Sequence, residues 1–569
     1  MSHRITRNQY TSYYGPTAGS KIRLGDTGLV AEVERDSAVP GEECVFGGAR
    51  SLRGAMGLSA TRENALDCAI VNVVVIDWSG IYKSDIGIKN GRIVGIGKAG
   101  IPDIMSAVTP GMALGAGTQI ISGEGLIATA GAVDCNCALD APGLAESALS
   151  AGITTVLGGG AGHASEFESS AGTPGVRQIE IMLRAADALP LNVGLMARAG
   201  SPKPHALIEQ IKAGAAGLNL SSAFGAAGAA LDCALAVSIQ FDLPIALEAD
   251  AFNEAGGYDD LLSALQGRPL RLNLAEGQGG GPTPDALRVC GEHRILAASS
   301  SGSLPASVNT LDELRALLYA RKRLDLRSVA DAAFVESAVR GGTLAAEDAL
   351  HDLGAIPIIA SGSMNSGRLN DMLGRVWQTA HKMLKQRGRL PQERGQNDNL
   401  RIRRYLAKYT INPALACGIA HETGSLEIGK LADVVLWKPA FFGRRPECVI
   451  KGGMLAWSQS GVSGAALPRV QPVAARANFG ALASSIPDCC VTFVSKLSLR
   501  EKTVEGLGLK KPLAAVKQWR GIAKQEMKFN HAEPRMALDL HNFAVLADSE
   551  IVSSAPPENL PLAQRYALF

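Results

Sequence analysis

The stretch Thr129-Ala130-Gly131-Ala132-Val133-Asp134-Cys135-Asn136-Cys137-Ala138 is the centre from which the fold of this chain can be predicted. It reads as a short apolar strand that leaves a glycine turn and gains polar atoms only at its carboxyl end. Side chains at i and i+2 of a strand point to the same side, so a His-x-His pair here would place two metal ligands in the mouth of a barrel. The two corresponding positions hold Asn136 and Ala138, and neither offers an imidazole.

From about residue 130 onward, short apolar runs alternate with amphipathic segments, which is the pattern of repeated β/α units. Eight runs are strand candidates, and they begin near Ala132, Ile153, Asn192, Ala215, Pro244, Pro269, Arg294 and Ile356. The amphipathic segments include Gly143–Gly152, Ile179–Leu189, Pro204–Ala213 and Ala226–Gln240. Eight such units predict an α/β protein with a TIM-type (β/α)8 barrel over residues 131–423.

The chain between the seventh and eighth strand candidates is long. It contains two further helical patterns, Thr310–Arg323 and Arg327–Val339. An excursion of this length over a barrel mouth is typical of a lid, so residues from about 300 to 355 are predicted to form one.

The segment before the barrel predicts a β-rich domain. Residues 1–130 alternate β-type runs with glycine turns. Within Ile86–Ile96, Asn90-Gly91 is a strong signal for a two-residue hairpin turn.

The segment after the barrel is expected to complete that domain. After a helix-like run to Tyr409, Gly424–Trp437 shows the alternation of a strand, a turn and a second strand. Residues 424–480 are therefore predicted to return to the β-rich domain. Residues 481–569 are predicted to form a mixed α/β extension with an apolar end that docks.

Composition excludes several classes of function. The 569 residues carry a net charge of +2, which gives no reason to expect nucleic acid or an anionic membrane as a partner. No apolar run is long enough for a membrane span, and the N-terminus lacks the apolar region of a signal peptide. The ten cysteines form no zinc-type CxxC pair, so a reducing cytoplasm is expected. Low charge with 64 glycines suits a protein that buries surface against other subunits, although a glycine- and alanine-rich composition explains it equally.

Several long stretches carry a resemblance to the α (large) subunit of bacterial urease, and the resemblance runs nearly from end to end. They are Tyr14-Gly15-Pro16-Thr17, Arg23–Thr27, Asp85–Arg92, Gly158–Gly160, Asn253-Glu254, Ala346–Asp348, Lys408–Ala414, Gly424–Gly443 and Ala563–Tyr566. The resemblance implies an amidohydrolase-type barrel with a β-rich composite domain.

The resemblance also implies what the family needs for its reaction, which is the hydrolysis of urea to ammonia and carbamate. Two nickel ions in the barrel mouth polarise the carbonyl and generate hydroxide at neutral pH. A carbamylated lysine bridges the metals, while histidines and one aspartate complete the ligands. The family's α subunits assemble with β and γ subunits into trimers of heterotrimers. A trimer-type homo-oligomer, urease β and γ subunits, or both are therefore the expected partners.

None of the six metal-ligand positions implied by the resemblance keeps the family's residue. In chain order these positions hold Asn136, Ala138, Asn219, Glu248, Leu274 and Gly362. The bridging lysine is replaced by Asn219, whose primary amide cannot be carbamylated, and Leu274 has no donor atom. Because the flanking motifs stay in register, the sequence predicts neither nickel nor another cofactor.

The positions implied to bind substrate or transfer protons are replaced as well. Ser221 stands for the substrate-binding histidine after the fourth strand, and Ala223 stands for an aspartate two residues later. The Cys-His-His of the lid, which supplies the mobile cysteine and the acid/base histidine, is Arg321-Lys322-Arg323, and a substrate-contacting arginine is Ala338. A protonated Lys322 cannot act as a base and would repel a metal cation.

Three acidic residues are candidates for a site with a different function. Glu248, Asp250 and Glu276 follow neighbouring strand candidates and are candidates for a weak cation site. Alternatively, Asn219 or Asn136 hydrogen-bonds Glu248 in a polar pocket.

Other candidate residues have structural interpretations. Strand alternation predicts that Cys135 and Cys137 face the outer helices as small buried residues. His163 is expected to be a loop histidine, and His351 a structural histidine at a helix end. Arg321-Lys322-Arg323 with Arg327 is expected to be a solvated helix face, although it could attract an anionic ligand.

Three functions remain. The first is a scaffold or regulatory protein that keeps the fold of the urease α subunit without its activity. The second is a hydrolase of changed substrate that uses Glu248 with Asp250 as a general base. The third is a nickel urease, as overall similarity to the family would suggest.

Overall fold

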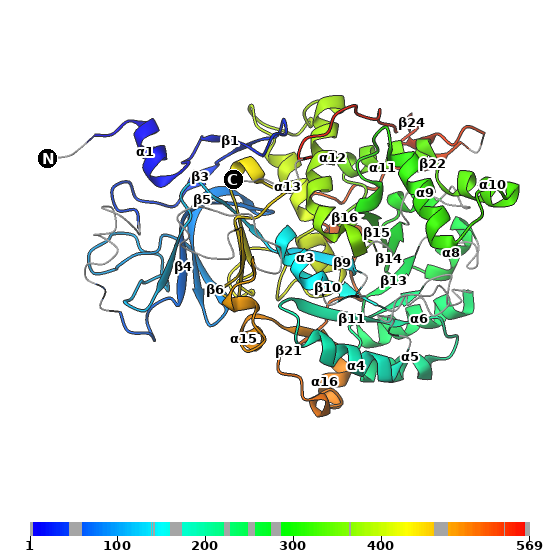
Figure 1. The fold of residues 1–569 in the computed structure, drawn as a ribbon, viewed down its shortest axis with the longest axis horizontal. Helices are drawn as coiled ribbons and strands as arrows, with labels where there is room; N and C mark the ends of the chain where they lie inside the picture. Colours follow the sequence, from blue (N-terminus) through cyan, green and yellow to red (C-terminus); the bar gives the residue numbers. More distant parts are fainter. Residues whose placement is uncertain are drawn as a thin grey trace.

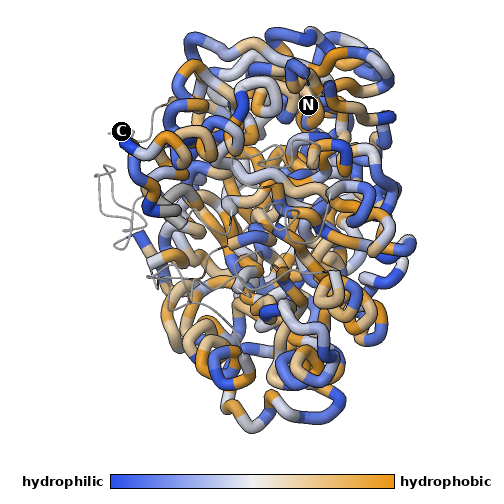
Figure 2. The backbone as a smooth tube through the Cα atoms, turned by 90° about the vertical axis from the view of Figure 1, so that its right-hand side faces the viewer, coloured by the Kyte–Doolittle hydropathy of each residue, from blue (hydrophilic) through white to orange (hydrophobic). Residues whose placement is uncertain are grey.

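The computed structural model describes residues 4–44, 58, 60–137, 139, 141, 143–159, 173, 175–220, 228–248, 257–274, 286–362, 366–459, 476–539 and 541–563. A β-rich body lies on one side of the molecule and a β/α barrel on the other (Figure 1). Hydrophobic stretches gather toward the middle of the molecule, and hydrophilic ones lie mostly on its outer turns (Figure 2). None of the described helices combines the length and the apolar character that crossing a bilayer requires.

Eight parallel strands form the barrel. They are β9 (Ala132–Cys137), β10 (Ile153–Gly158), β11 (Asn192–Arg198), β12 (Gly217–Leu220), β13 (Ile245–Glu248), β14 (Leu270–Leu274), β15 (Ile295–Ser300) and β16 (Ile358–Ala360). Each strand pairs with the next along the chain, and a parallel bridge between Cys137 and Gly362 joins the last to the first. The predicted TIM-type barrel is confirmed, with every strand beginning within two residues of its expected start.

Amphipathic helices cover the barrel. They are α3 (Leu144–Ala151), α4 (Val176–Ala186), α5 (Pro204–Lys212), α6 (Gly228–Phe241), α8 (Tyr258–Leu265), α11 (Gly341–Leu353), α12 (Met372–Arg387), α13 (Asn399–Ala407) and α14 (Ile411–Ala416). In α4 the buried residues are Ile179, Leu183 and Ala186, which share one helical face. After α13, the backbone carbonyls of Lys408 and Tyr409 accept hydrogen bonds from backbone N–H groups of β16 and β9, respectively. This segment therefore links the last barrel strand to the first.

Three α-helices stand among the described residues of the long excursion before the eighth strand, where at least two helical segments were expected. The two predicted ones are α9 (Thr310–Lys322) and α10 (Val329–Ala338), and α11 follows them. Their apolar faces form a cluster separate from the main core, which comprises Ala306, Leu314, Leu318, Val335, Ala338, Val339 and Leu344. Leu344 of α11 belongs to this cluster, so the two helices are also packed against a helix that covers the barrel.

The β-rich body is built around β4 (Cys68–Asp77), β5 (Gly80–Lys89) and β6 (Arg92–Gly97). Asn90 and Gly91 both have positive φ, at 48° and 73°, so the predicted two-residue hairpin turn is present. The chain returns from the barrel to this sheet, because β17 (Val434–Trp437) pairs with β8 (Ile127–Ala130), and β18 (Cys448–Lys451) and β19 (Met454–Ser458) follow.

The expected first strand within Gly424–Trp437 is absent, which corrects the prediction. Gly424 and Gly429 both have φ 93°, and the intervening residues form turns and irregular backbone. The backbone N–H of Leu426 donates to the carboxylate of Asp77 rather than to a neighbouring strand. The alternation of side chains therefore reflects a folded turn that is buried against β4.

The C-terminal segment is mixed, with short helices and strands. It contains α15 (Ile486–Cys489), β20 (Thr492–Val494), α16 (Lys496–Arg500), β21 (Leu513–Ala515), β22 (Met536–Leu538), β23 (Val545–Ala547) and β24 (Glu550–Ile551). β20 lies parallel to β11 and extends the barrel sheet. Near the end of the described chain, the N–H of Leu562 donates to Asp26 at 2.8 Å. Residues 564–569, which carry the expected apolar end, lie outside the described residues.

The remaining regular elements are short. They are α1 (Arg7–Tyr14), β1 (Lys21–Arg23), β2 (Val30–Glu32), β3 (Arg35–Asp36), β7 (Gln119–Ser122) and the 3-10 helices η4 (Ala286–Gly291), η5 (Ser301–Ser303), η6 (Ser366–Asp371), η7 (Pro439–Phe441), η9 (Phe479–Ala481), η10 (Glu505–Leu507) and η11 (Lys524–Glu526).

One buried carboxyl of the β-rich body predicts a pH dependence of stability. Burial raises the pKa of Asp85 to about 7, although the backbone N–H groups of Asn72 and Ala99 donate to its carboxylate. An unfolded aspartate titrates near pH ~4. The folded protein therefore holds a proton that the unfolded chain releases between these values. The stabilisation is complete at acid pH and is lost as the pH rises through about 7.

We therefore expect the melting temperature to fall between pH 5 and pH 8, and Asp85→Asn to reduce that fall because its amide is neutral throughout. Thermal unfolding monitored by circular dichroism across this range tests the prediction. Asp312→Asn, on an exposed position of α9, is the control. An equal fall in wild type and Asp85→Asn would contradict the assignment.

Candidate functional site

The strand register defines which side chains face the barrel interior. Ser299 in β15 lies 3.0 Å from Nε2 of His351 on α11, so Ser299 faces outward and its neighbour Ala298 faces the interior. Ala298 pairs with Asn273, and Asn273 pairs with Glu248. Paired residues of parallel strands share a face, so Asn273 and Glu248 also face the interior.

A carboxylate flanked by two amides lies on this interior face. Oε1 of Glu248 accepts a hydrogen bond from Nδ2 of Asn273 at 3.1 Å and a longer one from Nδ2 of Asn219 at 3.5 Å. All three side chains are buried, with exposed fractions of 9%, 1% and 3%. The expected contact between Glu248 and Asn219 is therefore present, and Asn273 joins it. We call Asn219, Glu248 and Asn273 the amide–carboxylate cluster.

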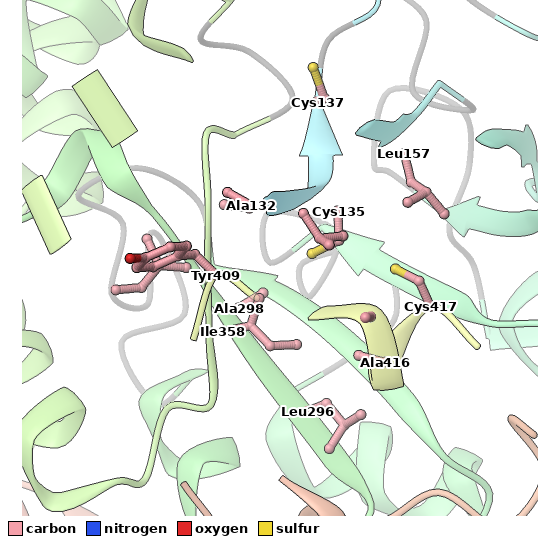
Figure 3. Close-up of a cluster of buried hydrophobic side chains, with 14 of the residues drawn as sticks. Ala132, Cys135, Cys137, Leu157, Leu296, Ala298, Ile358, Tyr409, Ala416 and Cys417 are labelled. Atoms are coloured by element: carbon pink, nitrogen blue, oxygen red, sulfur yellow. The ribbon is translucent and has the colours of Figure 1, made fainter. Parts of the chain in front are cut away.

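An arginine and two thiols lie beside this cluster. Arg271 precedes Asn273 by two residues on the same face, and its Nη1 donates to Sγ of Cys417 at 3.0 Å. Cys417 in turn shares a hydrogen bond with Cys135 of β9. Figure 3 shows Cys135 and Cys417 in one buried cluster with Leu157 of β10.

The position of Cys135 corrects the prediction that it faces the outer helices. β9 and β14 are not neighbours, so Cys135 can approach Arg271 only across the interior. The reason is the register. Val133 pairs with Thr155, a residue on the interior face. The register between β9 and β10 shifts twice, once between Ile153 and Thr155 and once between Val156 and Gly158. A shift of one residue reverses every side chain, and the sequence alone does not reveal where it occurs.

A buried aspartate connects the first barrel strand to the end of the last one. Asp134 accepts hydrogen bonds from the backbone N–H of Ser361 at 3.1 Å, from the Ser361 hydroxyl, and from the N–H of Asn136 at 3.3 Å. Burial raises its pKa, although these donors act in the opposite direction. The signal for this role was present in the sequence, because Asp134 is the first polar residue in an otherwise apolar strand.

The described metal-ligand positions offer few donor atoms. Asn136 and Asn219 carry amides, Glu248 carries a carboxylate, and Leu274 and Gly362 carry no donor. Within the described part of the chain, no group of three His, Cys, Asp or Glu side chains is arranged to hold a metal ion. Two amides and one carboxylate are a poor donor set for Ni²⁺, which favours imidazole. Ala138 lies outside the described residues.

Several predicted site residues are not located. Ser221, Ala223, Asp250, Glu276 and His163 lie outside the described residues, so Glu248 is the one member of the predicted acidic pocket that the structure places.

The lid positions are placed in part. The backbone of Arg321 and Lys322 lies in the last turn of α9, and Ala338 ends α10 and packs into the apolar cluster that α9 and α10 share. Arg327 is highly exposed and pairs with Asp325 at 3.1 Å, as expected for a solvated face.

His351 is structural, as expected. It lies in the last turn of α11 and is fully buried. Burial lowers its pKa, and its Nε2 lies 3.0 Å from the Ser299 hydroxyl on the outward face of β15.

Comparison with known proteins identifies the family. Residues 3–121 match the family model of the urease α-subunit N-terminal domain, and residues 122–464 match that of the amidohydrolase family. Similar solved structures include a D-hydantoinase (14% identity, TM-score 0.47, covering 69% of this chain and 95% of the other), a dihydropyrimidinase from Brevibacillus agri (13%, 0.47, 68% and 94%) and a D-aminoacylase (16%, 0.48, 70% and 98%). The two family models carry the assignment. The chain belongs to the amidohydrolase family and joins its barrel to the N-terminal domain of urease α subunits.

Proposed function

We propose that this protein is a catalytically inactive scaffold or regulatory relative of the urease α subunit, with no nickel centre. The observation that carries the proposal is the amide–carboxylate cluster, because two of its members, Asn219 and Glu248, stand where the resemblance implies metal ligands. Asn219 takes the place of the bridging lysine, and a primary amide lacks the amine that carbon dioxide would carbamylate.

The expected cost of these replacements is large. Loss of one hydrogen-bonding partner behind a metal ligand lowers metal affinity or activity roughly 10- to 100-fold. Here Leu274 and Gly362 contribute no donor at all, and Leu274 is buried, with 3% of its surface exposed. Losses of this size at several ligands leave no route to tight Ni²⁺ binding.

A hydrolase with a changed substrate is the second candidate, because membership of the amidohydrolase family makes hydrolysis plausible. In this case Glu248 would act with Asp250 as the general base. The hydrogen bonds from Asn219 and Asn273 disfavour this role, because they stabilise the carboxylate without a proton. A turnover on an amide or amidine that Glu248→Gln abolishes would favour this candidate over the scaffold.

The proposal predicts the outcome of a direct assay. After expression in nickel-containing medium, the purified protein should hold far less than one nickel ion per chain and should release no ammonia from urea. Elemental analysis and an ammonia-release assay measure these quantities, with an active urease prepared in parallel as the positive control. Two nickel ions per chain together with urea hydrolysis would establish an ordinary nickel urease instead.

We also propose that the protein assembles with itself in a trimer-type oligomer, with urease β and γ subunits, or with both. The match to the urease α-subunit N-terminal domain over residues 3–121 supports this, because that domain lies outside the barrel mouth. Co-expression with β and γ chains, followed by affinity purification and mass measurement, tests it. A monomer that captures neither chain would contradict it. The proposed location is the cytoplasm, in keeping with ten cysteines that are all free thiols.

A further inference from the structure

A segment near the end of the described chain lies along α12. Side chains spaced one helical turn apart hold it, and they are Gln378, Lys382 and Gln386. The amide of Gln386 accepts from the N–H of Ala555 at 3.0 Å and donates to the carbonyl of Ala555 at 2.6 Å. The amide of Gln378 donates to the carbonyl of Pro561 at 2.7 Å. We call residues 552–563 the C-terminal strap.

The end of the strap is fastened to the turn between β1 and β2. The N–H of Leu562 donates to the Asp26 carboxylate at 2.8 Å, and Leu562 is buried, with 6% of its surface exposed. A Cβ added at Gly25 would lie 2.7 Å from the side chain of Leu562, so the turn and the strap are in close contact. The position of the turn therefore determines the position of Leu562.

A histidine of α12 holds the same turn. The N–H of Gly28 donates to Nδ1 of His381 at 2.8 Å. Because a backbone N–H can only donate, Nδ1 must be unprotonated, and the ring must be the neutral tautomer with its proton on Nε2. Protonation of Nδ1 would place two donors against each other and break the hydrogen bond. This contact therefore requires a neutral His381.

The charged side chains that face His381 come from both sides of the contact. Burial lowers the pKa of His381, and the charge of Lys385, one turn further along α12, lowers it as well. From the β-rich body, Asp26 attracts the protonated ring, whereas Arg23 repels it. An unfolded histidine titrates near pH ~6.5. The contact is therefore complete above this pH, and it is lost as the pH falls through the lower pKa of the folded state.

We propose that His381 is an acid-sensitive latch, which holds the turn between β1 and β2, and through it the end of the C-terminal strap, on α12. At neutral pH the latch is closed. In acid the N–H of Gly28 loses its acceptor, and Leu562 is released together with the turn. The latch goes beyond the proposed function, because it does not depend on whether the barrel binds nickel or hydrolyses a substrate.

Hydrogen exchange followed by mass spectrometry tests the proposal on the full-length protein. Two peptides, one containing Gly28 and one containing Leu562, are followed between pH 5 and pH 8, with correction for the intrinsic pH dependence of amide exchange. We expect the protection of both peptides to fall in acid, by up to about tenfold per pH unit below the pKa of His381. The buried carboxyl of Asp85 cannot produce this fall, because it stabilises the fold in acid.

Two replacements of His381 separate titration from a purely structural role. His381→Asn places an amide oxygen near the position of Nδ1, so both peptides should keep their protection from pH 8 to pH 5. His381→Leu removes the acceptor, so both peptides should exchange rapidly even at pH 8. His205→Asn, at an exposed position of α5, is the matched control and should keep the wild-type pH profile. If His381→Leu does not fold by circular dichroism, the comparison of wild type with His381→Asn decides alone.

Three results would overturn the proposal. The first is wild-type protection that does not change between pH 5 and pH 8. The second is the same loss of protection in His381→Asn as in wild type, which would assign the loss to another titrating group. The third is a fall at Gly28 without a fall at Leu562, which would show that the strap does not depend on the turn.

Discussion

Replacement of Asp352 with alanine is expected to lower the free energy of unfolding by about 3–5 kcal/mol. The carboxylate of Asp352, on α11, accepts two hydrogen bonds from Arg401 on α13, at 2.8 and 3.0 Å. Both side chains are almost completely buried, with exposed fractions of 0% and 2%. The variant would leave the guanidinium of Arg401 charged and buried beside a void. Water cannot solvate that charge unless the packing of α11 and α13 on α12 opens.

Thermal and urea unfolding, followed by circular dichroism, measure the effect. The matched control is Asp325→Ala, which breaks the exposed ion pair with Arg327 between α9 and α10. Exposed pairs contribute little because water and salt screen them, so this variant should unfold like wild type. Equal shifts in both variants would mean that the Asp352–Arg401 pair is solvated in the protein and that the assigned burial is wrong.

The barrel was predictable because its strands are buried on both faces. Parallel strands of this kind appear as continuous apolar runs, and intervening amphipathic helices separate them clearly. The hairpin at Asn90-Gly91 was predictable for a local reason, since positive φ at two successive residues favours Asn and Gly. The absence of a first strand within Gly424–Trp437 was not predictable. The N–H of Leu426, which a strand would have used to pair with a neighbour, donates instead to the carboxylate of Asp77, far away in the sequence.

The candidate site was predictable only in part. The resemblance supplied Asn219 and Glu248, and their contact is present. Arg271 and Asn273 were missed, although Leu270–Leu274 alternates leucines with these two polar residues. Such alternation in a barrel strand indicates that the polar side chains face the barrel interior and that the leucines pack against the outer helices. In a half-exposed strand, by contrast, the polar side chains would face solvent. The resemblance drew attention to Leu274 instead, one residue beyond the side chain that reaches Glu248.

Cys135 shows a different limit. Its place in the interior follows from the pairing of β9 with β10, where two shifts occur within one short strand. The period of two fixes which residues share a face but not which face is inside. Which face of β9 lies inside is determined by its register with β10. That register depends on the backbone contact between Cys137 and Gly158, which the pattern of side chains in the sequence does not reveal.

The second large effect concerns that same backbone contact. Gly158→Ala should destabilise the barrel by at least about 3 kcal/mol, the upper end of the usual cost of overpacking. A Cβ at Gly158 would lie 1.8 Å from the carbonyl oxygen of Cys137 and 2.9 Å from its carbonyl carbon. No side chain can move aside, so β9 and β10 must separate where their pairing already shifts. Gly228→Ala is the control, because its Cβ would meet nothing within 4 Å and α6 should gain helix propensity.

Thermal unfolding together with gel filtration separates the two glycine variants. We expect Gly158→Ala to melt well below wild type or to aggregate, and Gly228→Ala to melt at or slightly above wild type. Wild-type stability in Gly158→Ala would mean that β9 can slide along β10 at little cost. In that case Cys135 could leave the interior, and its contact with Cys417 beside Arg271 would no longer be fixed by the fold. The rigidity of this one strand pair therefore determines whether the amide–carboxylate cluster has a defined electrostatic environment.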